Sequence, residues 1–144
     1  MYGVYDIVNK ILAFADKNDD PITNLKLQKL LYYEQGFHLA YFGTPLFNED
    51  LEAWIYGPVV PSVYEHFSKY GRGAITDISS NIIKLTKKDE EQLFYNVLRV
   101  YNKFSASALV EMTHNESPWK TTNVGTGSII EKAKLIKFFK TRLK

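Results

Sequence analysis

The side chains that most often carry acid–base or metal chemistry are sparse in this sequence of 144 residues. Its three histidines, His38, His66 and His114, include no pair four residues apart, the spacing by which one helix face holds zinc. Gly125-Thr126-Gly127 precedes a predicted helix but lacks the lysine of a phosphate-binding loop. Because the chain has no cysteine, thiolate catalysis, disulfides and cysteine-bound zinc are excluded. We expect no catalytic residues, no metal and no cofactor, and we predict that the protein is not an enzyme.

His114 is the best single candidate for acid–base chemistry. It lies near the C-terminal end of a predicted helix, where the helix dipole favours the imidazolium. Glu116 is close enough in sequence to pair with it, so general acid–base catalysis is one interpretation. The other, which we favour, is that a hydrogen bond from His114 holds the turn that follows.

Aromatic residues offer material for a protein–protein interface. Trp54 and Tyr56 are two residues apart, so on a strand they share one face. Gly57-Pro58 and Pro61 stiffen the loop between Trp54 and Tyr64, because proline fixes its own backbone and restricts the residue before it. The alternative is that both tryptophans, Trp54 and Trp119, belong to the core. The predicted partner-binding residues are Trp54, Tyr56, Gly57, Pro58, Tyr64, His114, Glu116 and Trp119, with Glu52, Glu65 and His66 as a polar rim.

Charge is distributed unevenly along the chain. Residues 84–144 contain 12 Lys and Arg and 6 Asp and Glu, a balance of +6, whereas residues 1–83 contain 6 and 10, a balance of −4. The last predicted helix carries Lys134, Lys137, Lys140 and Lys144 at helical spacing. This polarity suits an acidic protein or nucleic acid, but a solvated basic face is the simpler interpretation.

The elements that must position these residues are mostly helices. Apolar residues recur at helical spacing and capping residues precede them in six segments: Tyr5–Asp16, Leu25–Phe42, Pro61 to near Gly71, a segment after a Thr86/Asp89 capping box to Asn102, Ser105 to Thr113, and Ser128 to the C-terminus. Leu51–Tyr56 and Ile82–Leu85 are predicted strands that could pair, and Gly57-Pro58 is expected to end the first. We therefore predict a mainly α fold, a single compact bundle of about six helices with a small two-stranded β element.

The segment Leu25–Phe42 should lie at the centre of this bundle. Leu27, Leu30, Leu31 and several aromatic residues place apolar side chains around most of its circumference, as expected of a helix surrounded by others. The chain length suits one domain, which we expect to span residues 1–144. The N-terminus does not resemble a signal peptide, and no stretch is apolar enough for a membrane span, so we expect a cytoplasmic protein.

Four blocks of sequence stand out as motifs, in this order along the chain: TNLKLQKLLYY at Thr23–Tyr33, EAWIYGPVVP at Glu52–Pro61 with Tyr64, Leu109–His114, and Glu116 with Pro118-Trp119. Together they resemble the motifs of the Panacea domain family, also called SocA-like or GepA-like phage-associated proteins. The resemblance covers nearly the whole chain.

The resemblance implies a mainly helical antitoxin domain that neutralises a toxin encoded beside it, generally by binding it directly. In one branch of the family the domain instead acts as an adaptor that delivers its toxin to a ClpXP-type protease. The expected partner is therefore a cognate protein toxin, with a ClpXP-type protease as the alternative. Neither a membrane nor nucleic acid is expected as a partner.

Overall fold

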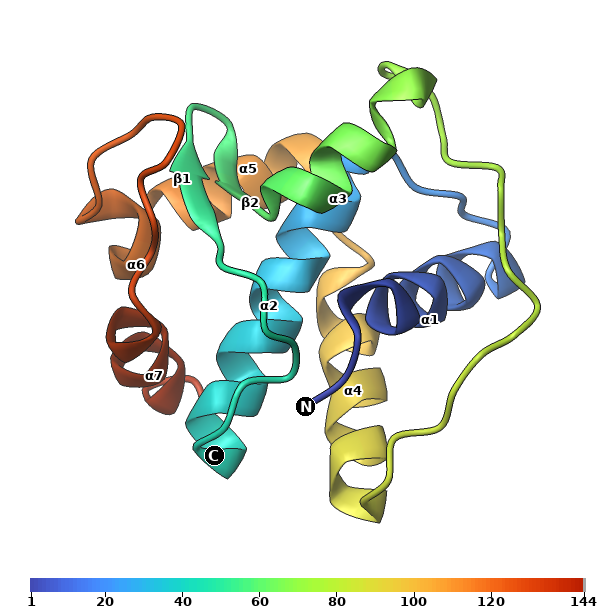
Figure 1. Ribbon diagram of the computed structural model, residues 1–144, viewed down its shortest axis with the longest axis horizontal. Helices are drawn as coiled ribbons and strands as arrows, with labels where there is room; N and C mark the ends of the chain where they lie inside the picture. The colour runs from blue at the N-terminus through green and yellow to red at the C-terminus, as the bar shows by residue number, and fades with distance from the viewer. Residues whose placement is uncertain (144) are drawn as a thin grey trace.

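The fold of residues 1–143, described by a computed structural model, is mainly helical with one small antiparallel sheet (Figure 1). Within this range there are seven α-helices, one short 3₁₀ helix and two strands. In chain order they are α1 (Val4–Lys17), α2 (Asn24–Phe42), β1 (Glu52–Trp54), β2 (Gly57–Val59), α3 (Pro61–His66), η1 (Ser68–Tyr70), α4 (Lys88–Tyr101), α5 (Ala106–His114), α6 (Ser117–Lys120) and α7 (Lys132–Lys140).

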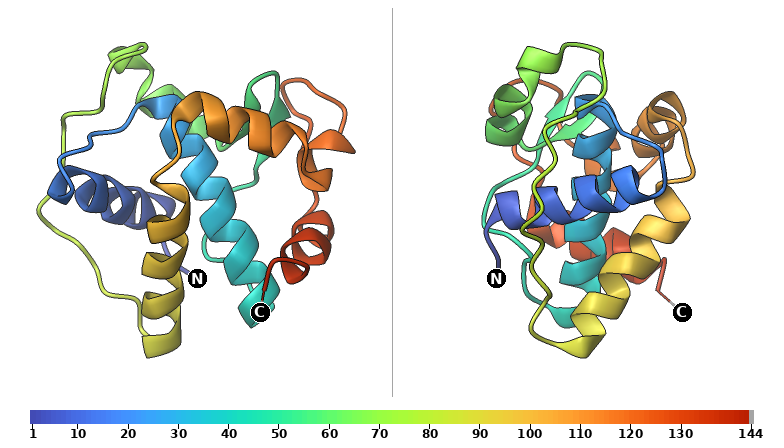
Figure 2. Two further views of the ribbon diagram at one scale, coloured as in Figure 1. Left: turned by 180° about the vertical axis from the view of Figure 1, so that it is seen from behind. Right: turned by 90° about the vertical axis from the view of Figure 1, so that its right-hand side faces the viewer.

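Helix α2 lies at the centre of the molecule, with α1, α4, α5 and α7 packed around it (Figures 1 and 2). The Thr23 side chain accepts a hydrogen bond from the backbone N–H of Lys26 and begins the helix. Gly43, in the left-handed conformation, ends it. Leu27, Leu30 and Leu31 are fully buried. The prediction that this helix is central is confirmed.

Aromatic rings fill the space between α2, α4 and α7. Tyr33 stacks on Tyr101 with ring centroids 3.9 Å apart, and Phe139 packs edge-on against Tyr32 and Phe37. Gly36 allows this close approach, because a Cβ atom at that position would overlap the ring of Phe139. Helix α7 therefore docks on α2 through a glycine and a phenylalanine.

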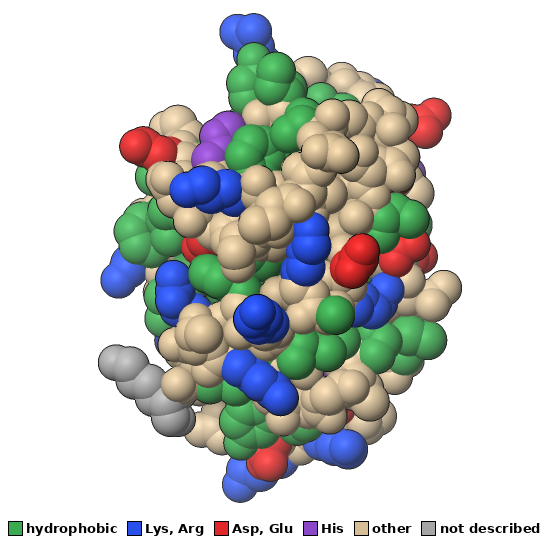
Figure 3. All heavy atoms as spheres, turned by 90° about the vertical axis from the view of Figure 1, so that its left-hand side faces the viewer, with side chains coloured by type: hydrophobic (Ala, Val, Ile, Leu, Met, Phe, Trp, Pro, Cys, Tyr) green, Lys and Arg blue, Asp and Glu red, His purple; other side chains and the backbone are tan. Residues whose placement is uncertain are grey.

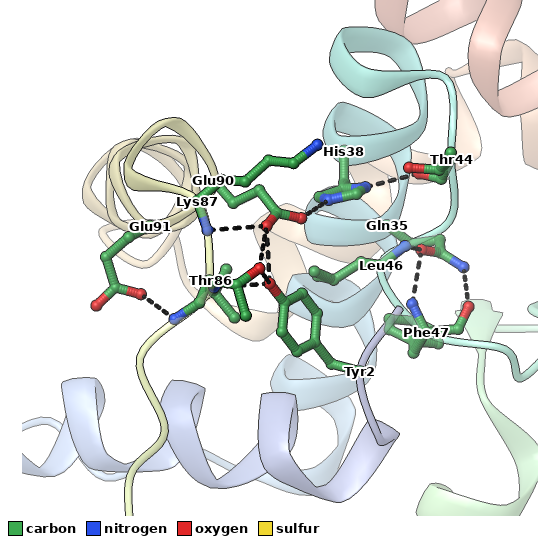
Figure 4. Close-up of polar contacts among 11 residues, drawn as sticks. Tyr2, Gln35, His38, Thr44, Leu46, Phe47, Thr86, Lys87, Glu90 and Glu91 are labelled. Carbon is green, nitrogen blue, oxygen red and sulfur yellow. Dashed lines mark hydrogen bonds and ion pairs between the residues drawn. The ribbon is translucent and has the colours of Figure 1, made fainter.

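A polar network joins the N-terminus, the C-terminal half of α2 and the start of α4 (Figure 4). The Tyr2 hydroxyl donates to Glu90 Oε1 at 2.7 Å, and His38 Nε2 lies 2.7 Å from Glu90 Oε2. His38 Nδ1 lies 2.6 Å from the Thr44 carbonyl oxygen and donates to it, because a carbonyl only accepts. Although burial raises the pKa of Glu90, hydrogen bonds from His38, Tyr2 and the backbone N–H of Lys87 outweigh it and lower the pKa.

The predicted pairing of Leu51–Tyr56 with Ile82–Leu85 is wrong. Strand β1 pairs instead with β2, with Trp54 opposite Gly57, so Gly57-Pro58 begins a second strand where the sequence predicted only a break. The segment Ile82–Leu85 is extended but has no strand beside it. A short hairpin turn brings neighbouring residues together at a lower entropic cost than a pairing across the 25 residues between Tyr56 and Ile82. This difference explains why β1 pairs with β2.

The last helix begins at Lys132 and not at Ser128, as predicted. The reason lies in the backbone of residues 125–130, which hydrogen-bonds to the free edge of β1: the Ser128 carbonyl oxygen accepts from Ala53 N–H, and Ile130 N–H donates to the Leu51 carbonyl. The N-cap of α4 is Lys87 and not Thr86, as predicted. The segment near Pro118, predicted to be irregular, contains the short helix α6. Lys144 lies outside the described residues.

None of the helices described combines the length and the apolar character needed to span a bilayer.

Candidate partner-binding surface

The turn between β1 and β2 presents large apolar side chains to solvent. Its two residues, Ile55 and Tyr56, are 68% and 64% exposed. Beside the turn, the Trp54 ring meets the Tyr64 ring of α3 edge-on, with centroids 5.3 Å apart, and Tyr64 is 38% exposed. We call Trp54, Ile55, Tyr56 and Tyr64 the hairpin surface. Large apolar groups gathered at an exposed turn are typical of protein–protein contact sites.

Two side chains from α5 and α6 hold this turn from behind. Trp119 Nε1–H donates to the carbonyl oxygen of Trp54 at 2.8 Å, and His114 Nε2 lies 3.0 Å from the carbonyl oxygen of Ile55. A carbonyl only accepts, so His114 carries a proton on Nε2. The two rings stack on each other with centroids 4.1 Å apart. Successive carbonyl groups of the turn are thereby fixed, and the exposed side chains project from an ordered backbone.

The base of the hairpin rests on the buried polar face of α2. Lys29 Nζ donates to the Pro58 carbonyl oxygen at 3.1 Å, and the Gln28 amide oxygen accepts from the backbone N–H of Val60 at 2.9 Å. Burial lowers the pKa of the Lys29 ammonium to about 7. Gly57 has φ +108°, and a Cβ atom there would lie 2.6 Å from Lys29 Cε. The close seat on α2 therefore requires glycine at this position.

Glu116 lies in the interior beneath α6. Its carboxylate accepts hydrogen bonds from the hydroxyls of Tyr32 and Tyr33, at 3.0 to 3.2 Å. Burial raises the pKa of Glu116, although these hydrogen bonds act in the opposite direction. Burial and the neighbouring carboxylate raise the pKa values of both tyrosine hydroxyls. Glu116 therefore joins the start of α6 to the centre of α2.

The lower part of the face that carries α6 and α7 is basic. Figure 3 looks onto this side of the molecule, and Lys and Arg side chains spread over its lower part. Two of the α7 lysines have structural contacts: Lys134 Nζ donates to the Thr121 carbonyl at 2.8 Å, and Lys132 pairs with Asp50 at 3.1 Å. Lys137 and Lys140 are exposed. Part of the predicted basic stripe therefore docks α7 on its neighbours.

Comparison with known proteins assigns the family. The model described as "Antitoxin SocA-like, Panacea domain" matches residues 27–120. Antitoxin SocA of Caulobacter vibrioides (strain NA1000 / CB15N) is 37% identical over 133 residues, which cover 85% of this chain and 71% of that protein. The chain belongs to the SocA-like Panacea family. No solved structure matches it.

The family match includes α2 from Leu27 onward, both strands and helices α3 to α6. It therefore covers the hairpin surface and the two side chains, His114 and Trp119, that hold the turn. The resemblance deduced from the sequence motifs is confirmed, and the structure gives those motifs a common purpose. The polar residues of the first block contact the second block, and the tyrosines of the first block contact the glutamate of the last.

The structure divides the predicted partner-binding residues of this Panacea domain into two groups. Tyr56 and Tyr64 are exposed, and Trp54, His114 and Trp119 are half-buried in contact with one another or with the turn. The others, Gly57, Pro58 and Glu116, are buried. The suggested pair of His114 with Glu116 does not form, because His114 reaches the hairpin and Glu116 the tyrosines of α2. Trp54 and Trp119 are both half-buried, so neither is a fully exposed surface residue and neither is a fully buried core residue.

Sequence reasoning missed Ile55, the most exposed apolar residue of the hairpin. The prediction of a single strand over Leu51–Tyr56 hid it, because Ile55 then pointed away from the face shared by Trp54 and Tyr56. The signal was present in Gly57, a residue that tolerates the positive φ of a tight hairpin. Of the predicted rim, Glu65 and His66 are exposed, whereas Glu52 accepts from Trp54 Nε1–H and from the N–H of Gly127.

Proposed function

We propose that this protein is an antitoxin that neutralises a protein toxin by binding it directly, with the hairpin surface at the centre of the contact. Membership of the SocA-like family and the similarity to a protein named Antitoxin SocA support the antitoxin role. The observation that carries the proposed site is the exposure of Ile55 and Tyr56 at 68% and 64% on a turn held by two hydrogen bonds.

The turn of the hairpin surface is ordered before it binds a partner. A flexible loop loses conformational entropy when it binds, and each immobilised side chain costs about 0.5–1.5 kcal/mol. Here Trp119 and His114 already hold the carbonyl groups of the turn, so most of the backbone ordering precedes the encounter. Burial of Ile55 and Tyr56 then contributes to affinity with little further loss. Standard interfaces bury about 800 Å² on each partner, so the hairpin supplies the centre and neighbouring elements the rim.

In this proposal the residues have different tasks. Ile55, Tyr56 and Tyr64 contact the toxin. Trp119 and His114 position the turn, and Gly57, Pro58 and Glu116 support it from inside the fold. No side chain carries out a chemical step, so the protein acts by occupying a surface of the toxin and not by catalysis. A cytoplasmic location is part of the same proposal.

The proposal is tested with the product of the adjacent gene as the candidate toxin. Both proteins are co-expressed with a tag on one of them, and the untagged partner is expected to co-purify. The purified toxin is then assayed with and without this protein, with no protease present. We expect inhibition at equimolar amounts. A toxin that is inhibited only after addition of a ClpXP-type protease and ATP would support delivery for degradation instead, and failure to co-purify would contradict direct binding.

A further inference from the structure

The long connection between η1 and α4 runs down one side of the molecule, past α1 (Figures 1 and 2). Its last part, residues 82–85, lines two hollows of about 830 and 570 Å³. The opposite wall of both hollows is α4, and both include Tyr95 and Arg99. Because they share these residues, the two hollows form one groove, which we call the α1–α4 groove.

The α1–α4 groove is strongly cationic. Lys17, Lys84, Lys88 and Arg99 line it and are exposed. Within residues 1–143, none of these four forms an ion pair with a carboxylate. The other two charged residues that line the groove, Lys10 and Glu91, neutralise each other, because Lys10 Nζ lies 2.9 Å from Glu91 Oε1. A groove of this kind attracts a negatively charged ligand.

The extended wall of the groove offers main-chain hydrogen bonds. Ile82-Ile83-Lys84-Leu85 has the apolar, β-branched character of a strand, yet no strand of the described chain pairs with it. The Ile83 carbonyl accepts from Lys10, and the N–H of Leu85 donates to Glu91. Across the described residues, the N–H groups of Ile82, Ile83 and Lys84 make no hydrogen bond. An extended segment with free N–H groups is a template for an added strand.

We propose that the α1–α4 groove binds an extended acidic segment of a partner protein. The partner's backbone pairs with Ile82–Lys84, and its carboxylates reach the four free cations. This site is separate from the hairpin surface, which is formed by β1, β2 and α3, and it does not depend on the proposed function of that surface.

The observations favour a peptide over nucleic acid. Free backbone N–H groups in an extended segment match the repeat of another peptide chain.

The test uses the full chain and a fluorescein-labelled peptide of about eight residues, roughly the length of a long strand, in which Glu and Val alternate. Fluorescence anisotropy measures binding, with a Lys–Val peptide and a single-stranded oligonucleotide of equal charge as comparisons. We expect the Glu–Val peptide alone to bind, with an affinity that falls as salt rises. Tighter binding of the oligonucleotide, or no peptide binding at about 1 mM protein, overturns the proposal.

Two charge-reversal variants locate the site. Arg99→Glu and Lys84→Glu should each weaken peptide binding by about ten-fold or more, at an unchanged melting temperature. Lys137→Glu, an equal charge change on exposed α7, is the matched control and should bind as the wild type does. Equal loss in all three variants would mean attraction to net charge and would contradict a groove.

Amide hydrogen exchange tests the strand pairing itself. Exchange at Ile82 and Lys84 should slow in the complex with the peptide, because the N–H groups of alternate residues share one edge of an extended segment and then donate to the added strand. Amides of Ile55 and Tyr56 should be unaffected. Unchanged exchange at residues 82–84, or protection confined to the hairpin, would exclude strand addition at this groove.

Discussion

At the scale of single residues, the polar side chains of α2 hold distant parts of the chain together. Lys29 donates a hydrogen bond to the Pro58 carbonyl oxygen in β2, and the Gln28 amide oxygen accepts one from the N–H of Val60. Asn24 donates to the carbonyl oxygen of Tyr64. Each of these groups is buried. A buried polar group that loses its partner costs about 1–3 kcal/mol. The polar positions of the first motif therefore act through the fold.

Lys29 gives the protein a specific dependence on pH. In the folded protein its pKa is about 7, because burial disfavours the ammonium form, whereas in the unfolded chain the ordinary value of 10.5 applies. Between these values the unfolded chain binds the proton and the folded protein does not, so this group makes the folded state more stable as pH rises. Below pH 7 that gain is absent.

We therefore predict that the free energy of unfolding of the wild type, relative to Lys29→Met, rises by up to about 1.4 kcal/mol per pH unit between pH 7 and 10. Urea unfolding of both proteins at several pH values measures this difference. The subtraction removes the titration of groups that both proteins share, including Glu116. A difference that stays flat or falls over this range would mean that Lys29 is not buried as an amine.

Gly57 is the residue at which a single methyl group should do most damage. In Gly57→Ala the new Cβ would meet Lys29 Cε at 2.6 Å and Thr113 Oγ1 at 2.8 Å, at a φ that alanine rarely adopts. We expect a loss of at least about 2 kcal/mol in unfolding free energy. Gly43→Ala is the control, because its φ is +77° but nothing lies within 4 Å of the added atom; it should lose about 1 kcal/mol. Equal losses would show that steric contact at Gly57 is unimportant.

At the scale of elements, α2 determines how the other helices are arranged. Leu30 lies at its middle and is fully buried. Leu30→Ala should lower the unfolding free energy by about 2–5 kcal/mol, since the cavity it leaves is enclosed by packed helices. Tyr41, on the same helix but 55% exposed, supplies the control: Tyr41→Ala should change stability by less than about 0.5 kcal/mol. A melting temperature of Leu30→Ala close to that of the wild type would contradict a central position of α2 in the core.

Most helices could be predicted because their signals are local. Apolar spacing and capping residues act over four residues, and Thr23 and Ser105 cap α2 and α5 as expected. The β element could not be predicted fully, because Ile82–Leu85 has strand character and only the three-dimensional arrangement decides whether a partner lies beside it. The start of α7 was misplaced for the same reason, since Ser128 is held by β1, far away in sequence.

Only part of the candidate surface follows from local features of the sequence. Aromatic residues and stiff prolines are visible in the sequence, and these features indicate Tyr56 and Tyr64 as surface candidates. Burial of Gly57, Pro58 and Glu116 depends on residues some 30 to 80 positions away, among them Lys29 and Tyr32. A lysine is rarely buried, and no local pattern marks Lys29 as an exception. The motif resemblance identifies the blocks that form the candidate surface, but it does not show which of their residues face solvent.

At the scale of the whole molecule, we propose a protein that acts by binding alone, without a chemical step. His114 is the residue that tests this, because its imidazole lies beside the proposed contact and bonds to the hairpin turn. The variant His114→Gln keeps a donor for the Ile55 carbonyl but cannot act as an acid or base. We expect it to bind and neutralise the toxin as the wild type does. A folded His114→Gln protein that binds the toxin yet fails to neutralise it would reveal a chemical role.

The central claim is that the toxin contacts the hairpin surface, and toxin affinity measured by titration calorimetry tests it most directly. The double variant Ile55→Ala/Tyr56→Ala removes the two exposed side chains. The control is Tyr41→Ala, which removes another exposed ring, away from the hairpin. We expect the double variant to lose at least ten-fold in toxin affinity, about 1.4 kcal/mol, at an unchanged melting temperature. Tyr41→Ala should bind the toxin with wild-type affinity. Wild-type affinity in the folded double variant would contradict the central claim.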